Sequence, residues 1–127
     1  MEKSKKLIWL KRVLLLKVIL IFTAWAPALI AWPEFLKLLG IPWPDNPIFL
    51  RLFGALQTSL GVAYIYAYKD PLKNKDIVKV GIFENGLMTL TLLFLGFTTG
   101  ISPFLWISVF FTTFFCVSFL VFKPAAR

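Results

Sequence analysis

The stretch "VKVGIFENGLMTLTLLFLGFTT", residues 78–99, decides what kind of fold this chain can form. A helix that crosses a bilayer needs about 20 mainly apolar residues, and this stretch is long enough. It nevertheless carries Glu84 and Asn85 side by side near its beginning. An ionisable side chain inside a membrane is costly, so such a residue is by default a hypothesis about function.

The composition of the whole chain is that of an integral membrane protein. Of its 127 residues, 59% are hydrophobic and 16% are charged. A typical soluble domain is about half apolar and about a quarter charged. No polar stretch is long enough to build a separate soluble domain, so we expect a single membrane domain over residues 1–127, in contact with the lipid bilayer.

Four segments are long and apolar enough to span a membrane. The beginning of the chain resembles a signal peptide, but Pro27 directly after "AWA" and Lys17 within the apolar run favour a retained first span. The links are short, which predicts an all-α integral membrane protein folded as an antiparallel bundle of four transmembrane helices. The longest link contains "EFLKLLG", which predicts a short helix on the membrane surface. The predicted spans are about 13–32, 48–68, 78–99 and 101–122, and the surface helix is about 34–40.

The distribution of basic residues predicts the orientation. An even number of spans puts both termini on one side, and that side receives most of the Lys and Arg residues, including those of the "KDPLKNKD" loop. The other side has only Lys37 and Arg51. Because cytoplasmic loops are enriched in Lys and Arg, we expect both termini in the cytoplasm and the protein in the inner, cytoplasmic membrane. The net charge of +8 is then a topology signal, and no nucleic-acid partner is expected.

Small residues on the second span predict where helices pack. In lipid, helices associate where small side chains let their backbones approach closely. This places the second helix centrally in the bundle. The fourth span is rich in Phe, which predicts lipid contact and core filling, with a surface for a partner protein or an apolar ligand groove as the alternatives. The predicted packing residues of the second span are Gly54, Ala55, Ser59, Gly61 and Ala63.

Counting helix rise from the basic edge predicts a polar layer inside the membrane. Residues that lie five positions inward from that edge are about 7.5 Å deep on each helix. Asn85 is one step deeper, and Gln57 lies about 10 Å beyond Tyr64 on the same helix face. The residues expected to share this layer are Lys17, Tyr64, Glu84 and Ser118. The candidate intramembrane polar site consists of Lys17, Gln57, Tyr64, Glu84 and Asn85.

This polar site has structural and functional interpretations. Lys17 can extend its amine to the membrane surface on its long stem. Glu84 can pair with Lys17, or it can be protonated. Alternatively, the site handles a ligand, a proton or a substrate. Asn85 and Gln57 can serve as hydrogen-bonding groups between helices.

The sequence gives no sign of catalysis. The chain has no His, its single Cys116 lies in an apolar run, and no P-loop, GxGxxG or GxSxG motif occurs. One carboxylate at helix depth, without a second acid or a set of metal ligands, favours a non-enzymatic role. No metal site and no catalytic residue are predicted, and a quinone or a lipid is the ligand class that such a bundle can hold.

The segment "FLKLLGIPWPDNPIFLRLFGALQTSLGVAYIYAYKDP" resembles the small four-helix bacterial membrane proteins of the DoxX-like group. The resemblance rests on the Leu-rich segment that ends in Gly40, on "RLFGALQTSLGVAY" and on the "KDP" that follows, and it extends over nearly the whole chain. It implies a four-helix antiparallel bundle. Some members of this group are subunits of sulfur-compound:quinone oxidoreductases, and distant relatives assist the assembly of membrane proteins, so the resemblance implies a role of one of these kinds. No catalytic residue is transferred by this resemblance.

Three functions remain open from the sequence. The packing ladders and the lack of catalytic motifs favour a non-enzymatic accessory or assembly subunit, in a homo-oligomer or a larger membrane complex. The first alternative is a binder of a small hydrophobic ligand, a quinone or a lipid, which would link it to a quinone oxidoreductase. The second alternative is a small transporter that uses Glu84.

Overall fold

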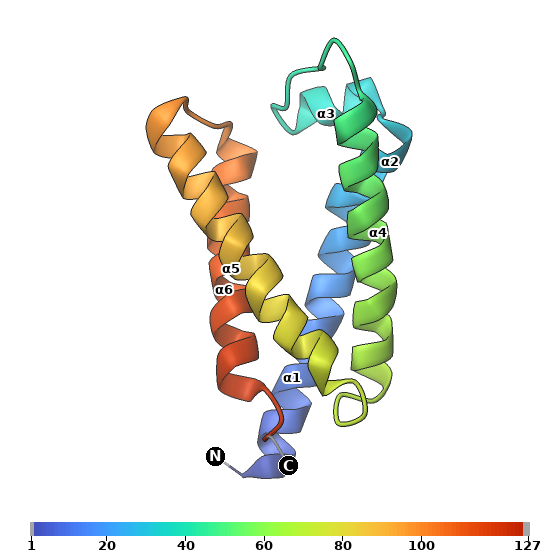
Figure 1. Ribbon diagram of the computed structural model, residues 1–127, viewed down its shortest axis with the longest axis vertical. Coiled ribbons are helices and arrows are strands. Elements are labelled where there is room, and N and C mark those ends of the chain that lie inside the picture. Colours follow the sequence, from blue (N-terminus) through green and yellow to red (C-terminus); the bar gives the residue numbers. More distant parts are fainter. Residues whose placement is uncertain (1, 126–127) are drawn as a thin grey trace.

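The computed structural model describes residues 2–125, and all its regular secondary structure in that range is helical (Figure 1). Four helices in it are long and apolar enough to cross a membrane: Lys3–Ile30, Ile48–Lys69, Lys75–Thr98 and Pro103–Phe122. The prediction of four spans packed as a bundle is therefore confirmed. The elements in chain order are α1 (Lys3–Leu20), the π-helical turn η1 (Ile21–Trp25), α2 (Pro27–Ile30), α3 (Pro33–Leu38), α4 (Ile48–Lys69), α5 (Lys75–Thr98) and α6 (Pro103–Phe122).

The first helix differs most from its predicted bounds. It begins at Lys3 and not near residue 13, because Lys, Arg and Leu are good helix formers and continue the helix beyond the apolar run. The other three spans begin and end within about three residues of the predicted positions, which is the usual precision of boundaries read from sequence. The short α3 corresponds to the predicted surface helix.

Pro27 shapes the far end of the first helix. A proline has no N–H, so the helix cannot continue through it with regular hydrogen bonds. The residues just before it form the π-helical turn η1, in which the Ala26 N–H donates to the Ile21 carbonyl at 2.8 Å. Pro27 then occupies the first position of α2, where a missing N–H costs nothing. Ala31, at a left-handed φ of 49°, ends this short helix.

The bundle consists of two helix pairs. The first helix packs along α4, and α5 packs along α6. The pairs meet at one end, where α1 begins, the α4–α5 link lies and α6 ends, and they diverge toward the other end (Figure 1). We name these the basic end and the far end. The main apolar core lies in the basic half and includes Leu14, Tyr64, Val78, Phe115 and Phe119.

Glycines make the contact between α4 and the first helix close. A Cβ at Gly54 would collide with the backbone of Ala28 and Leu29, and a Cβ at Gly61 would lie 2.9 Å from the Phe22 ring. The other small residues predicted to pack lie elsewhere: Ala55 and Ala63 are half-buried, and Ser59 is exposed. Gly54 and Gly61 are seven residues apart, so they lie on one face of α4, and this face packs against the first helix. Ser59 lies on another face and is not part of the contact.

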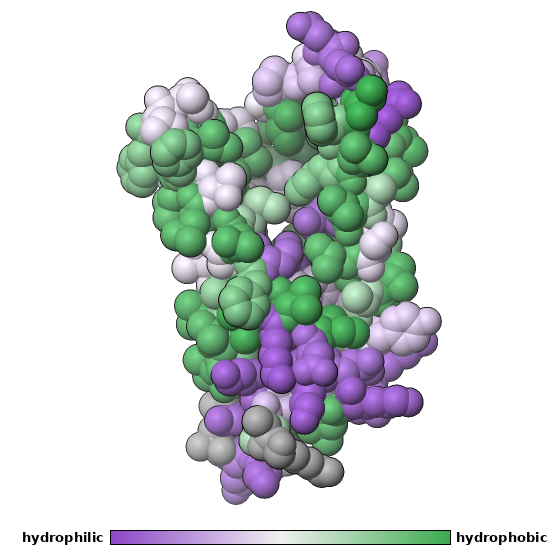
Figure 2. Space-filling view, in the orientation of Figure 1, coloured by the Kyte–Doolittle hydropathy of each residue, from purple (hydrophilic) through white to green (hydrophobic). Residues whose placement is uncertain are grey.

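Large apolar side chains cover the outside of the bundle. Phe49 and Phe97 are about four-fifths exposed, at 81% and 80%. Figure 2 shows hydrophobic residues over the helix bodies and hydrophilic residues gathered at the basic end. Such apolar exposure is tolerated in lipid, and it agrees with four helices that contact a bilayer along their length.

Candidate intramembrane polar site

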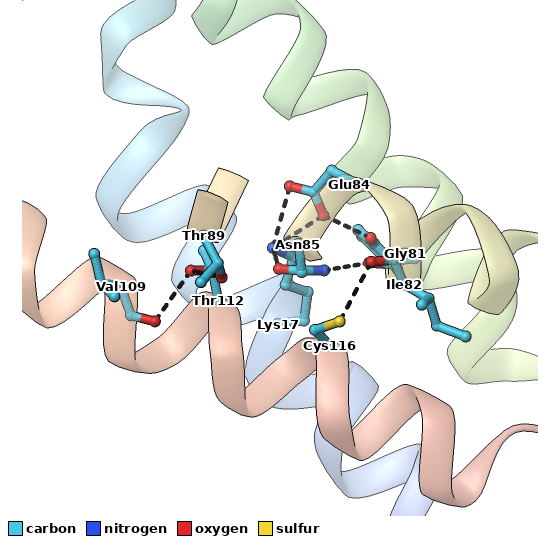
Figure 3. A network of polar contacts seen from close by, with 10 residues as sticks. Lys17, Gly81, Ile82, Glu84, Asn85, Thr89, Val109, Thr112 and Cys116 are labelled. Atoms are coloured by element: carbon cyan, nitrogen blue, oxygen red, sulfur yellow. Dashed lines mark hydrogen bonds and ion pairs between the residues drawn. The ribbon is translucent and has the colours of Figure 1, made fainter. Parts of the chain in front are cut away.

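Lys17 of α1 crosses the bundle and reaches α5. Its side chain points inward, and the residue is only 5% exposed. Its Nζ donates to Asn85 Oδ1 at 2.7 Å and lies 3.3 Å from Glu84 Oε2 (Figure 3). The amine is therefore bound inside the bundle and does not extend to the membrane surface.

Tyr64 of α4 supplies a second partner for the carboxylate. Its hydroxyl donates to Glu84 Oε2 at 2.9 Å, and its ring stacks on Phe119 with 5.9 Å between centroids. Gly81 makes this position available, because a Cβ there would lie 2.8 Å from the Tyr64 hydroxyl oxygen. Gly81, one turn before Glu84, thus leaves room for the Tyr64 phenol of α4 to pack against α5.

Asn85 has a single orientation that satisfies all its neighbours. Its Oδ1 accepts from Lys17, and its Nδ2 donates to the Gly81 carbonyl at 2.7 Å. It is fully buried, so each of these bonds replaces water that cannot enter. The rings of Phe115 and Tyr64 add cation–π contacts, with Lys17 Nζ at 5.0 and 5.7 Å from their centroids. Lys17 and Glu84 carry opposite charges, so the site is neutral as a whole.

Gln57 lies beyond this closed set. It is 5% exposed, yet its amide makes no hydrogen bond within residues 2–125. No fully buried side-chain nitrogen or oxygen in that range lacks a partner, so the amide atoms of Gln57 keep a small exposed surface. Gln57 and Tyr64 are seven residues apart and point in nearly the same direction, with Gln57 about 10 Å nearer the far end.

A hollow lies where the two helix pairs separate. Figure 2 shows it between the halves of the molecule, above hydrophilic side chains in the middle of the bundle. The Glu84 side chain is 13% exposed, whereas Asn85 beside it is fully buried. Toward the far end, the Trp25 ring of η1 contacts Phe53 of α4 and Phe104 of α6, each with centroids 5.4 Å apart.

The structure thus brings four of the five candidate site residues into one connected set, and it leaves Gln57 as a separate group on the same face of α4. Ser118 is buried on α6 but makes no hydrogen bond to this set within residues 2–125. Sequence reasoning missed Phe115, Phe119 and Gly81 as members. The signal for the two phenylalanines was their four-residue spacing, which puts both on the inner face of α6.

Further polar contacts join α5 to α6. Thr89 Oγ1 donates to Thr112 Oγ1 at 2.7 Å, and the Cys116 thiol donates to the Ile82 carbonyl at 3.6 Å (Figure 3). Within residues 2–125 no group of three or more His, Cys, Asp or Glu side chains is placed to hold a metal ion. These contacts act as links between helices.

The fold and the site together define the class of protein: this is a small polytopic membrane protein, with four candidate transmembrane helices and a neutral polar cluster among them. Comparisons with protein-family models, curated proteins and solved structures find no match to the chain. The resemblance to the DoxX-like group therefore stays a prediction that rests on the residues quoted for it.

Proposed function

We propose that the protein binds an apolar molecule with a neutral hydrogen-bonding head, a lipid or a quinone, in the hollow between its helix pairs. The observation that carries this proposal is Gln57, a nearly buried amide with accessible atoms and no partner among the described residues. A polar group in an apolar site usually fixes the orientation of a ligand whose remainder is held by apolar contacts.

The charge of the site selects the kind of head group. Lys17 and Glu84 already compensate each other, and both Glu84 oxygens have donors. A charged head would be buried without a counter-charge, which is costly. A carbonyl or hydroxyl head can instead exchange hydrogen bonds with the Gln57 amide and the exposed edge of Glu84. The apolar remainder would leave the hollow between α4 and α5, directly into the bilayer.

Native mass spectrometry of the protein released from mild detergent tests this function. We expect one retained apolar molecule per chain, with its occupancy reduced about tenfold in Gln57→Leu because the buried hydrogen bond to the head group is lost. Ser59→Ala is the matched control, since Ser59 lies on the same helix but faces outward. The absence of any stoichiometric molecule from the wild-type protein, or equal occupancy in both variants, would contradict the proposal.

A second candidate function is that of an accessory or assembly subunit, and one observation favours it. Ser59 is exposed and is flanked at four-residue spacing by the half-buried Ala55 and Ala63. Such a smooth strip lets another transmembrane helix approach closely. Crosslinking in native membranes tests this function: Ser59→Leu should abolish a specific adduct with another chain, and a protein that is monomeric and free of adducts would exclude it.

The orientation that we propose has the basic end in the cytoplasm, with the protein in the inner membrane. The starting point is the enrichment of Lys on the α4–α5 link and near both termini. Thiol labelling of single cysteines in a Cys116→Ala background tests it. A cysteine in place of Lys73 should react only in permeabilised cells, and one in place of Asp45 should react in intact cells. The reverse pattern would overturn the orientation.

A further inference from the structure

A second cavity lies at the basic end of the bundle, away from the polar site. It has a volume of about 670 Å³ and lies between the beginning of α1 and the end of α6. This size is within the roughly 300–1,000 Å³ range of small-molecule sites. Its walls include Lys3, Lys6 and Lys123 on the basic side and Leu10, Leu120 and Val121 on the apolar side.

The basic and apolar residues are segregated along one helix face. Lys3, Lys6 and Leu10 follow one another at three- and four-residue spacing, so their side chains share one side of α1. Lys6 lies about 6 Å and Lys3 about 10 Å beyond Leu10 along the helix axis. The headgroup layer of a bilayer is roughly 5–7 Å thick on each side. With Leu10 at the edge of the hydrocarbon core, these two lysines are at or just outside the level of the lipid phosphates.

The three amines have no acidic partner within residues 2–125. The ion pairs in that range are Lys17 with Glu84 and Lys79 with Asp76, and neither involves a cavity lysine. Lys3 and Lys123 are exposed, and Lys6 is half-buried. The unpaired lysines can bind an anionic phosphate, and the apolar wall beside them can contact an acyl chain. A phospholipid carries both groups in one molecule.

We infer that this cavity is a binding site for a single anionic phospholipid. The phosphate lies among Lys3, Lys6 and Lys123, and the first part of an acyl chain lies along Leu10, Leu120 and Val121. Basic pockets between transmembrane helices on the cytoplasmic side are a recurrent kind of site for acidic headgroups. This inference does not depend on the ligand proposed for the hollow, because the two sites share no residue.

The test titrates phosphatidylglycerol and phosphatidylcholine into the detergent-solubilised protein and counts bound lipids by native mass spectrometry. The wild-type chain should bind one phosphatidylglycerol at least about tenfold more tightly than phosphatidylcholine. The variant Lys3→Gln/Lys6→Gln/Lys123→Gln should lose that preference. The control Lys5→Gln/Lys11→Gln/Lys69→Gln removes the same charge from the same end outside the cavity and should keep it within about twofold.

Three results would overturn the inference. Equal losses in the two triple variants would mean that the attraction is diffuse over the basic end. Equal affinity of the wild-type protein for the two lipids would mean that the cavity does not recognise the anionic headgroup. Displacement of the lipid by millimolar inorganic phosphate, with phosphate alone bound as tightly, would make the cavity a simple anion site. None of these lysines is fully buried, and helicity measured by circular dichroism should be the same in every variant.

Discussion

The basic half and the far half of this bundle are built from the same four helices but are held together differently. In the basic half, Lys17, Tyr64 and Glu84 connect α1, α4 and α5 through side-chain bonds, and Phe115 and Phe119 of α6 complete the core. In the far half, α4 and α5 diverge. The contacts across the bundle there are made by aromatic rings such as Trp25 and by Ser102, whose hydroxyl donates to the Leu39 carbonyl at 3.4 Å. A satisfied polar set thus holds one half of this bundle together, whereas the far half retains the nearly buried Gln57 amide without a partner among the described residues.

The largest effect that we expect comes from removing the cation of the fixed half. Lys17→Met leaves Asn85 Oδ1 without its donor and leaves the buried Glu84 carboxylate with only the Tyr64 hydroxyl and no cation. Loss of one partner from a buried pair costs about 3–5 kcal/mol of unfolding free energy. Thermal unfolding in detergent should therefore begin at a much lower temperature. The double variant Lys17→Met/Glu84→Gln should recover much of the loss, and a single variant as stable as the wild type would disprove this role for the pair.

A smaller effect is expected at the glycine that admits Tyr64. In Gly81→Ala the new Cβ would lie 2.8 Å from the Tyr64 hydroxyl oxygen and 2.9 Å from the Phe119 ring. Overpacking of this kind costs about 1–3 kcal/mol. Gly86→Ala on the same helix is the control, because its Cβ would meet only Cys116 Sγ at 3.5 Å, an ordinary contact. If both alanine variants unfold at the same temperature, the basic half is less tightly packed than described.

The far half should respond in the opposite direction. Gln57→Leu removes a nearly buried amide without a partner among the described residues, so the lipid-stripped protein should gain about 1 kcal/mol of stability. In the presence of the bound molecule this gain should vanish or reverse, because the wild-type amide is then satisfied. Calorimetry before and after stripping measures both states. A loss of stability in the stripped variant would show that Gln57 already has a structural role.

The smallest effect is expected within a helix pair. Thr89→Val removes the hydrogen bond from Thr89 to Thr112 between α5 and α6. Bonds of this kind between transmembrane helices contribute about 0.6 kcal/mol on average. Unfolding should shift only slightly, and ligand occupancy should not change. A shift as large as that of Lys17→Met would mean that the α5–α6 pair, and not the polar set, fixes the bundle.

The sequence was sufficient for the four helices and for the depth of their polar residues. Apolar length defines a span, and a rise of about 1.5 Å per residue puts Lys17, Tyr64 and Glu84 at one level. The sequence was not sufficient for the partners on α6, because depth alone does not tell which face of that helix turns inward. Ser118 is buried as expected but makes no hydrogen bond to the polar set within residues 2–125, whereas Phe115 and Phe119 pack in the core beside it.

The divergence of the helix pairs was also beyond the sequence. It depends on how closely Gly54 and Gly61 bring α4 to the first helix, and on how Pro27 and the π-helical turn redirect that helix at its far end. These are contacts between distant segments, which local patterns do not encode. The same limit explains why the exposed Ser59 was expected to pack inside.

Distances between spin labels test the contrast between the two halves most directly. In a Cys116→Ala background, one pair of labels at Leu52 and Phe94 reports the far half, and another at Tyr68 and Val80 reports the basic half; all four positions are exposed. Double electron–electron resonance should give a narrow distribution for the basic pair, unchanged by lipid stripping. The far pair should give a broader distribution that narrows when the apolar ligand is restored. Equally narrow distributions for both pairs, insensitive to stripping, would contradict an open far half.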